Sequence, residues 1–168
     1  FEILKKFDIK KKQFYKTLKN FNALKYRQEI IYKSKKLTII NDSKSTSYSS
    51  SISILKSLSN VYWIVGGLAK KGDTFLLSKK YCKTFKAYIF GKNKNLFNKQ
   101  LKNKMNCQNF KDLPSLIKKI LLDIKNDNNT RHKTIIFSPA AASFDSFKNF
   151  EDRGSRFNEL IRILKFKN

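Results

Sequence analysis

The chain has 168 residues and a formal net charge of +25, from 37 lysine and arginine residues against 12 aspartate and glutamate residues. No apolar run approaches the ~20 residues of a membrane span, so we expect no membrane partner. Two cysteines make no disulfide framework, which favours the cytoplasm. A single histidine without a Cys/His cluster leaves no zinc site, so we expect no metal bound by this chain itself. The lysines form no run of about five or more, which favours a solvated surface and leaves a basic nucleic-acid-binding domain as the alternative.

The first 22 residues are predicted to form a helix, because apolar residues from Ile9 to Phe21 recur at helical spacing. This helix has nothing to pack against before the next element, which suggests that it belongs to a structure further upstream. The start at Phe1 rather than methionine is consistent with a fragment or a processed chain. Residues 22–29 are predicted to be a linker, so we divide the chain into residues 1–22 and a domain at residues 23–168.

The rest of the chain alternates between apolar runs and amphipathic stretches. Strands are predicted at residues 29–33, 37–40, 61–65, 85–90 and 134–137, with a weaker extended piece near 105–107. Helices are predicted at residues 47–58, 75–81, 94–101 and 112–124, and along the apolar stripe from Phe147 to Leu164. This alternation is typical of a Rossmann-like, three-layer α/β domain with a mostly parallel sheet flanked by helices.

Polar or glycine-containing segments follow several of the predicted strands. They are Asp42-Ser43-Lys44, Gly66-Gly67 with Lys70, Gly91-Lys92, and the small-residue loop from Ser138 to Ser143. The carboxyl ends of parallel strands share one edge of a sheet, so these segments are expected to converge there, where ligands bind in open α/β sheets. Their cationic and hydroxyl-rich character suits an anionic ligand. The spacing of a Walker A phosphate loop is absent.

Three of these segments carry a resemblance to a known family. The string S-P-A-A-A-S-F-D-S-F-K-N-F-E-D-R-G, from Ser138 to Gly154, resembles the C-terminal signature of the UDP-N-acetylmuramoyl-L-alanine:D-glutamate ligases, which are Mur ligases of peptidoglycan synthesis. N-D-S-K-S-T at 41–46 resembles their N-D-S-K-A-T motif, and Gly66 to Lys70 matches their G-G-x-x-K. The family more often has cysteine at Ala141 and often histidine at Tyr26. A sibling Mur or folylpolyglutamate-type ligase is a further alternative, but strings 41–46 and 138–154 favour D-glutamate.

The resemblance implies an α/β domain from a longer, three-domain, monomeric enzyme. Residues 1–22 would be the tail of its central ATPase domain, and residues 23–168 its C-terminal amino-acid-binding domain, which is not catalytic alone. The implied reaction phosphorylates the carboxylate of UDP-N-acetylmuramoyl-L-alanine with ATP, and the amine of D-glutamate then attacks the acyl phosphate. The implied cofactors are ATP and Mg²⁺, and the metal ligands would lie mostly on the central domain.

The resemblance also implies roles for individual residues. Arg27 and Asp42 would contact ATP, and Lys44 would be the catalytic residue beside the transferred phosphate. The residues implied to hold D-glutamate are Thr46, Lys70, Ser143, Phe144 and Phe150. From the residues alone, Lys71 is an equal candidate to its neighbour, Ser143 could equally be a helix cap, and Phe150 is more typical of a core.

Overall fold

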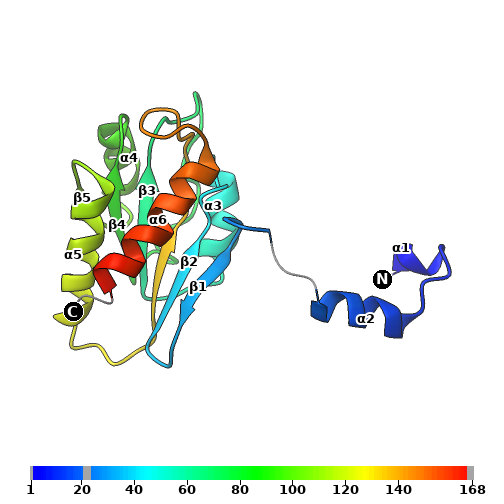
Figure 1. The fold of residues 1–168 in the computed structure, drawn as a ribbon. Helices are drawn as coiled ribbons and strands as arrows, with labels where there is room; N and C mark the ends of the chain where they lie inside the picture. The colour runs from blue at the N-terminus through cyan, green and yellow to red at the C-terminus, as the bar shows by residue number, and fades with distance from the viewer. Residues whose placement is uncertain (1, 21–23, 166–168) are drawn as a thin grey trace.

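The computed structural model describes residues 2–20 and 24–165, and most of these residues form one α/β domain (Figure 1). The domain is built on a six-stranded sheet in the order β1-β2-β6-β3-β4-β5. All neighbouring pairs are parallel except the antiparallel pair of β1 and β2. The strands are β1 Glu29–Lys33, β2 Leu37–Asn41, β3 Val61–Gly66, β4 Phe85–Phe90, β5 Asn106–Asn109 and β6 Lys133–Phe137.

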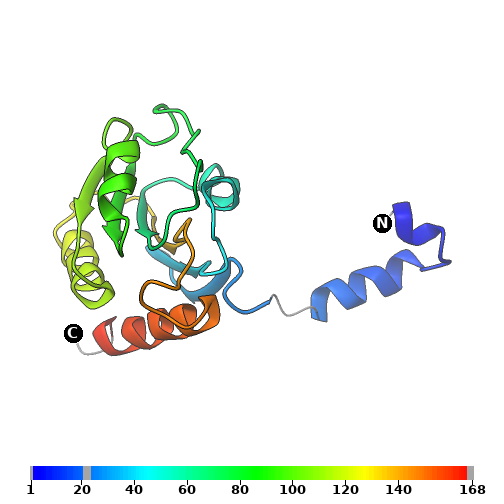
Figure 2. The same ribbon diagram turned by 90° about the horizontal axis from the view of Figure 1, so that it is seen from above.

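Helices cover both faces of this sheet, as the view from above shows (Figure 2). One apolar cluster lies between the sheet and α3 and α4, and a second lies between the sheet and α5 and α6. The helices are α1 Glu2–Lys5, α2 Lys11–Asn20, α3 Tyr48–Leu55, α4 Lys94–Leu101, α5 Leu113–Lys125 and α6 Phe150–Lys165. The predicted three-layer, Rossmann-like α/β fold with a mostly parallel sheet is confirmed.

The central strand β3 explains why both faces are covered. Trp63 and Val65 belong to the first apolar cluster, and Tyr62 and Ile64 belong to the second. Successive side chains of a strand point to opposite faces, so an unbroken apolar run can be buried only when each face has its own layer of helices. All residues of β3 are buried.

The helix predicted at residues 75–81 is wrong. Phe75 and Leu77 are buried whereas Leu76 is 81% exposed, an alternation that belongs to extended chain rather than to a helix. The carbonyl oxygens of Phe75 and Leu77 accept hydrogen bonds from the Lys104 ammonium at 2.6 and 3.0 Å. A tertiary contact therefore takes the carbonyl groups that helical turns would have used.

The single helix predicted at residues 1–22 is also wrong in detail. It is divided into α1 and α2 by a turn in which Asp8 has a φ angle of 55°, a conformation that aspartate tolerates better than most residues. Phe21, which the predicted stripe included, lies outside the described residues. Both helices stand away from the sheet in Figures 1 and 2, and Tyr15 and Leu18 are about half exposed.

The other predicted elements are confirmed with shifted ends. Helix α3 ends at Leu55 rather than at residue 58, and α6 begins at Phe150, so Phe147 precedes the helix. Phe147 nevertheless packs against the second apolar cluster. Within residues 2–20 and 24–165, every helix is too short or too polar to serve as a membrane span.

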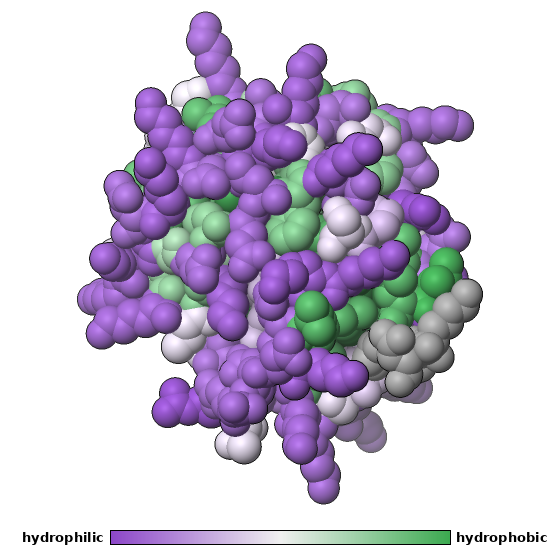
Figure 3. All heavy atoms as spheres, turned by 90° about the vertical axis from the view of Figure 1, so that its left-hand side faces the viewer, coloured by the Kyte–Doolittle hydropathy of each residue, from purple (hydrophilic) through white to green (hydrophobic). Residues whose placement is uncertain are grey.

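The surface is as basic as the composition requires. Figure 3 shows hydrophilic side chains spread over the whole visible face, with small apolar areas between them.

Candidate functional site

The polar segments predicted to converge do meet at the carboxyl edge of the sheet. The Ser138 hydroxyl donates to Asp42 Oδ2 at 2.7 Å, which joins the segments after β6 and β2. Leu68 and Ala142 exchange two backbone hydrogen bonds of 3.0 and 2.9 Å, which join the segments after β3 and β6. The Lys92 amide after β4 donates to Asp145 Oδ2 at 2.9 Å.

Asp42 uses both carboxylate oxygens inside the domain. Oδ2 accepts from Ser138, and Oδ1 accepts from the Gln28 amide at 3.1 Å. Burial raises the pKa of Asp42 above its ordinary value, although the hydrogen bonds from Ser138 and Gln28 and the charge of Arg27 act to lower it. In this structure Asp42 joins the linker to the loop after β6, and its contact with ATP stays a prediction.

A buried group of serine hydroxyls continues from this carboxylate. The hydroxyl oxygens of Ser138 and Ser51 lie 2.8 Å apart, and those of Ser51 and Ser45 also lie 2.8 Å apart. The Trp63 indole N–H donates to the Ser138 carbonyl at 2.8 Å. The serines at 43–53, which the sequence suggested only as helix caps, therefore also connect α3 to the end of β6.

Arg153 is a site residue that sequence reasoning missed. It lies in the first turn of α6, is 1% exposed, and donates from Nε to the Ser43 hydroxyl and from Nη2 to the Ser43 carbonyl, at 3.1 and 2.7 Å. Nη1 donates to the Ala141 carbonyl at 2.9 Å. Burial lowers the pKa of Arg153 to about 10, so the guanidinium remains charged at neutral pH. It links the loop after β2 to the small-residue loop and adds a positive charge beneath them.

Helix α6 is attached to the end of β2 by a second contact. The side-chain Nδ2 of Asn41 donates to the Gly154 carbonyl at 2.8 Å and to Asn158 Oδ1 at 2.7 Å. A Cβ atom on Gly154 would lie 2.4 Å from the ring of Tyr26, so only glycine lets the linker lie this close to α6. This contact explains the glycine of the E-D-R-G string.

The linker is held at two points on either side of Arg27. The Tyr26 carbonyl accepts from the Lys44 amide at 3.0 Å, and the Gln28 amide donates to Asp42. Tyr26 and Gln28 both have positive φ angles, 61° and 50°. Arg27 itself is exposed, so its side chain is available to a group outside the domain.

Lys44 and Phe150 are in direct contact. The Lys44 ammonium lies 3.9 Å from the centroid of the Phe150 ring, within the range of a cation–π interaction. The Ser43 hydroxyl donates to the Phe150 carbonyl at 2.8 Å. The structure thus brings together two predicted site residues that are far apart in the sequence.

The other predicted amino-acid ligands differ in exposure. Thr46 and Lys70 are exposed, as is Lys71, and Phe144 is 71% exposed. Ser143 is 3% exposed, and its carbonyl accepts from two later amides of the turn at 143–147, which agrees with a structural role in that turn. The ligand roles of these residues stay predictions.

The edge suits an anion better than a metal ion. Among residues 2–20 and 24–165 there is no group of three His, Cys, Asp or Glu side chains that could hold a metal. The exposed guanidinium of Arg27, the ammonium of Lys44 and the buried charge of Arg153 fit the phosphates of a nucleotide. The residues present therefore fit ATP, whereas they offer no ligand set for its Mg²⁺.

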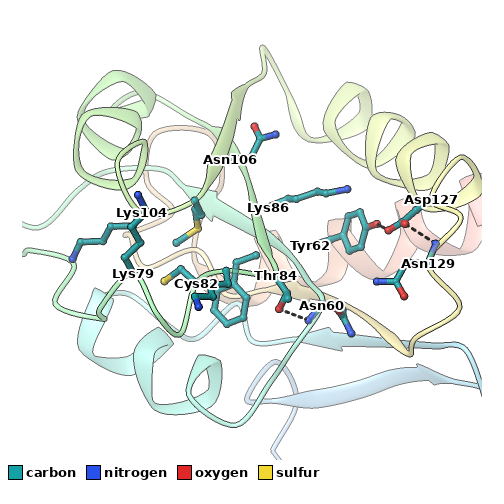
Figure 4. Close-up of a pocket in the computed structure, with 13 residues that line it drawn as sticks. Asn60, Tyr62, Lys79, Cys82, Thr84, Lys86, Lys104, Asn106, Asp127 and Asn129 are labelled. Atoms are coloured by element: carbon teal, nitrogen blue, oxygen red, sulfur yellow. Dashed lines mark hydrogen bonds between the residues drawn. The ribbon is translucent and has the colours of Figure 1, made fainter.

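A large cavity lies at the opposite, amino edge of the sheet (Figure 4). It measures about 550 Å³ and is lined by residues at the starts of β3, β4 and β5. Its central groups are already engaged: the Tyr62 hydroxyl donates to Asp127 at 2.6 Å, Lys86 lies over the Tyr62 ring, and Lys104 donates to backbone carbonyls. None of the predicted site residues lines this cavity, so size alone does not identify the candidate site.

The fold and the carboxyl edge define a Rossmann-like domain that gathers cations and hydroxyls at one edge of its sheet. No family model matches the chain. The UDP-N-acetylmuramoylalanine–D-glutamate ligase of Wolbachia pipientis wMel is 36% identical over 152 residues, which are 89% of this chain and 29% of the relative. The ligase of Rickettsia conorii is 31% identical over 170 residues, which cover 99% of this chain and 33% of the relative. The ligase of Hydrogenobaculum sp. is 34% identical over 148 residues, which cover 88% of this chain and 35% of the relative.

The chain belongs to the UDP-N-acetylmuramoylalanine–D-glutamate ligase family. It spans about a third of the length of the curated relatives it matches.

Proposed function

We propose that this chain is the C-terminal, D-glutamate-binding domain of an ATP-dependent ligase that joins D-glutamate to UDP-N-acetylmuramoyl-L-alanine. The contact between Lys44 and Phe150 is the main structural support, because it joins the N-D-S-K-S-T and S-F-K-N-F segments at one edge. The D-glutamate in the names of the relatives favours this substrate over those of sibling ligases. The dispersed lysines offer no comparable support for a nucleic-acid-binding domain.

In this proposal the domain supplies binding and orientation. ATP, when bound, provides the phosphoryl group that activates the acyl carboxylate, and Mg²⁺ is held mostly by a central domain. Arg27 reaches the phosphates from its position between the two anchored linker residues. Lys44 stabilises negative charge as the amine of D-glutamate attacks the acyl carbon and phosphate leaves. Asp42 acts on the nucleotide from the linker side.

The two carboxylates of D-glutamate require cations and hydroxyl donors. Lys70 and Thr46 are both exposed at the edge where the loops meet, and Ser143 and Phe144 border it. Holding both carboxylates orients the amine towards the acyl phosphate, which is where positioning lowers the barrier. Phe150 forms one wall beside Lys44.

The proposal extends to the architecture of the whole enzyme. Residues 1–22 are the tail of a central ATPase domain with a phosphate loop, and residues 23–168 are the final domain of a cytoplasmic, monomeric enzyme. Phosphate release by the isolated chain should therefore not depend on D-glutamate. Such dependence in residues 1–168 alone would contradict this assignment.

The direct test uses the complete polypeptide in which these residues occur. We expect phosphate release that requires ATP, UDP-N-acetylmuramoyl-L-alanine and D-glutamate together. Lys70→Ala should mainly raise the KM for D-glutamate, and Lys71→Ala shows whether its neighbour has that role instead. Lys33→Ala, on the exposed edge strand β1, is the matched control. Unchanged glutamate kinetics in both loop variants would remove this loop from the site.

A further inference from the structure

The segments that carry Thr46 and Lys70 are joined by one carboxylate. Asp73 Oδ2 accepts a hydrogen bond from the Tyr48 amide at 2.7 Å, and Tyr48 is the first residue of α3. The Asp73 amide donates to the Lys70 carbonyl at 3.1 Å, which closes the turn from Lys70 to Asp73. Asp73 is therefore hydrogen-bonded both to Lys70 and to the start of α3, two residues after Thr46.

The contact with α3 is favourable for electrostatic reasons. The first amides of a helix have no partner inside the helix, and its N-terminus carries a partial positive charge. Ser47 already caps the Ser50 amide, and the Asp73 carboxylate satisfies the Tyr48 amide. A charged acceptor makes this bond stronger than a neutral one would.

Other contacts hold the same loop independently of Asp73. The Ala69 amide donates to Asn93 Oδ1 at 2.9 Å, before the turn. After the turn, the side-chain Nε2 of Gln100 donates to the Asp73 carbonyl at 3.2 Å. The side-chain Oε1 of Gln100 accepts from the Phe75 backbone amide at 3.1 Å. Asn93 and Gln100 attach the loop to α4, whereas the Asp73 side chain links it to α3. The ring of Tyr48 also packs against Phe75, with centroids 5.4 Å apart, so loss of the Asp73 side chain should loosen only the turn from Lys70 to Asp73 against the start of α3 without unfolding the loop.

We propose that Asp73 is a positioning residue that sets the spacing between Lys70 and Thr46 and thereby selects a dicarboxylate amino acid of the right length. This inference rests on the proposed function. A fixed spacing between two carboxylate-binding groups discriminates D-glutamate from D-aspartate, which is one methylene shorter. Without the Asp73 link, the spacing is no longer fixed and both affinity and discrimination are lost.

The test measures steady-state kinetics of the complete enzyme with D-glutamate and with D-aspartate. Asp73→Ala should raise the KM for D-glutamate about tenfold with little change in kcat, and should lower the ratio of kcat/KM for D-glutamate to that for D-aspartate. Asp73→Asn keeps an acceptor oxygen for the Tyr48 amide, so the rise in KM should be about threefold or less.

The matched control is Asp112→Ala. The Asp112 carboxylate accepts from the Ser115 amide at 2.9 Å at the start of α5, so it makes the same kind of contact at a different helix. We expect this control to lower the melting temperature without changing the KM or the discrimination. If Asp73→Ala does not fold, Asp73→Glu replaces it, because a longer carboxylate keeps the charge but shifts the turn and should also lower the discrimination.

The outcomes separate this inference from the function on which it rests. A wild-type enzyme that turns over D-glutamate, with Asp73 variants that keep its KM and its discrimination, would overturn the positioning role alone. A wild-type enzyme without D-glutamate-dependent turnover would overturn both.

Discussion

The ammonium of Lys44 lies 3.9 Å from the centre of the Phe150 ring, across more than a hundred residues of sequence. The neighbouring Ser43 hydroxyl donates to the Phe150 carbonyl at 2.8 Å, so both the backbone and the ring of Phe150 contact the loop after β2. The start of α6 therefore determines where the Lys44 ammonium lies at the edge of the sheet.

Phe150→Leu should lower kcat of the complete enzyme about fivefold and lower its melting temperature by no more than about 4 °C. The substitution keeps an apolar side chain but removes the ring face, and a cation–π contact at a partly exposed site contributes about 1 kcal/mol. Steady-state kinetics at saturating substrate measure the effect. Phe150→Tyr keeps the ring face and serves as the control, and a Leu variant with wild-type kcat would contradict the role of the ring.

Arg153→Lys should destabilise the chain by about 3 kcal/mol. Lysine cannot reproduce the fork that reaches both the Ser43 backbone and the Ala141 carbonyl, and buried acceptors would be left without donors. Urea denaturation measures the loss. Arg156→Lys is the control on the same helix, because that exposed side chain pairs with the exposed Glu159 and its replacement should cost about 0.5 kcal/mol or less. Equal losses of stability in the two variants would contradict the role of Arg153 in linking the loop after β2 to the small-residue loop.

Tyr48→Phe should leave the chain equally stable or stabilise it by about 1 kcal/mol. The Tyr48 hydroxyl is buried and has no hydrogen-bond partner among the described residues, so its removal relieves a desolvation cost. Tyr62→Phe is the contrasting variant, because the Tyr62 hydroxyl donates to Asp127 at 2.6 Å and its loss should destabilise by about 1 kcal/mol. Thermal unfolding separates the two, and a destabilised Tyr48 variant would show that its hydroxyl has a partner.

Asp42→Asn should change the pH dependence of stability. The pKa of Asp42 is raised in the folded chain by burial, whereas an aspartate in the unfolded chain titrates near ~3.9. As the pH rises above ~3.9, Asp42 loses its proton in the unfolded state before it does so in the folded state. The contribution of Asp42 to the free energy of unfolding therefore decreases until the pH has passed the raised pKa of the folded state. The melting temperature of the wild type relative to Asp42→Asn should therefore decline as the pH rises above the unfolded pKa of ~3.9.

Asp112→Asn provides a control of opposite sign. The pKa of Asp112 is lowered, mainly by the hydrogen bond from the Ser115 amide, so its contribution appears above the unfolded pKa and is lost as the pH falls. Relative to this variant, the wild type should gain stability as the pH rises. Parallel pH profiles for the two variants would contradict the opposite shifts.

Much of the fold could be predicted because its elements are locally consistent. The run from Val61 to Val65 is apolar throughout, and both of its faces are buried. The helix predicted at residues 112–124 forms as α5, with the Asp112 carboxylate as its cap and Pro114 in its first turn. The convergence of the loops at 42–44, 66–70 and 138–143 followed from parallel topology alone, because such strands end at one edge.

The predictions that failed concern segments whose structure depends on contacts with residues distant in the sequence. The segment 75–81 has a helix-like composition, but its carbonyls are taken by Lys104 from beyond α4. The sequence did not single out Arg153, because no local pattern shows that Ser43 and Ala141 would surround it. Its position in the first turn of α6, next to Gly154, was the only signal that could have drawn attention to it.

The sequence alone determined most of the order of strands and helices along the chain, the edge at which polar segments gather, and the family resemblance of those segments, because each depends on local patterns of residues. Tertiary structure decided which groups are joined at that edge: Asp42 to the linker, Lys44 to Phe150, and Asp73 to the start of α3. These pairings depend on distances between residues remote in sequence, and only the packed sheet and its helices define such distances.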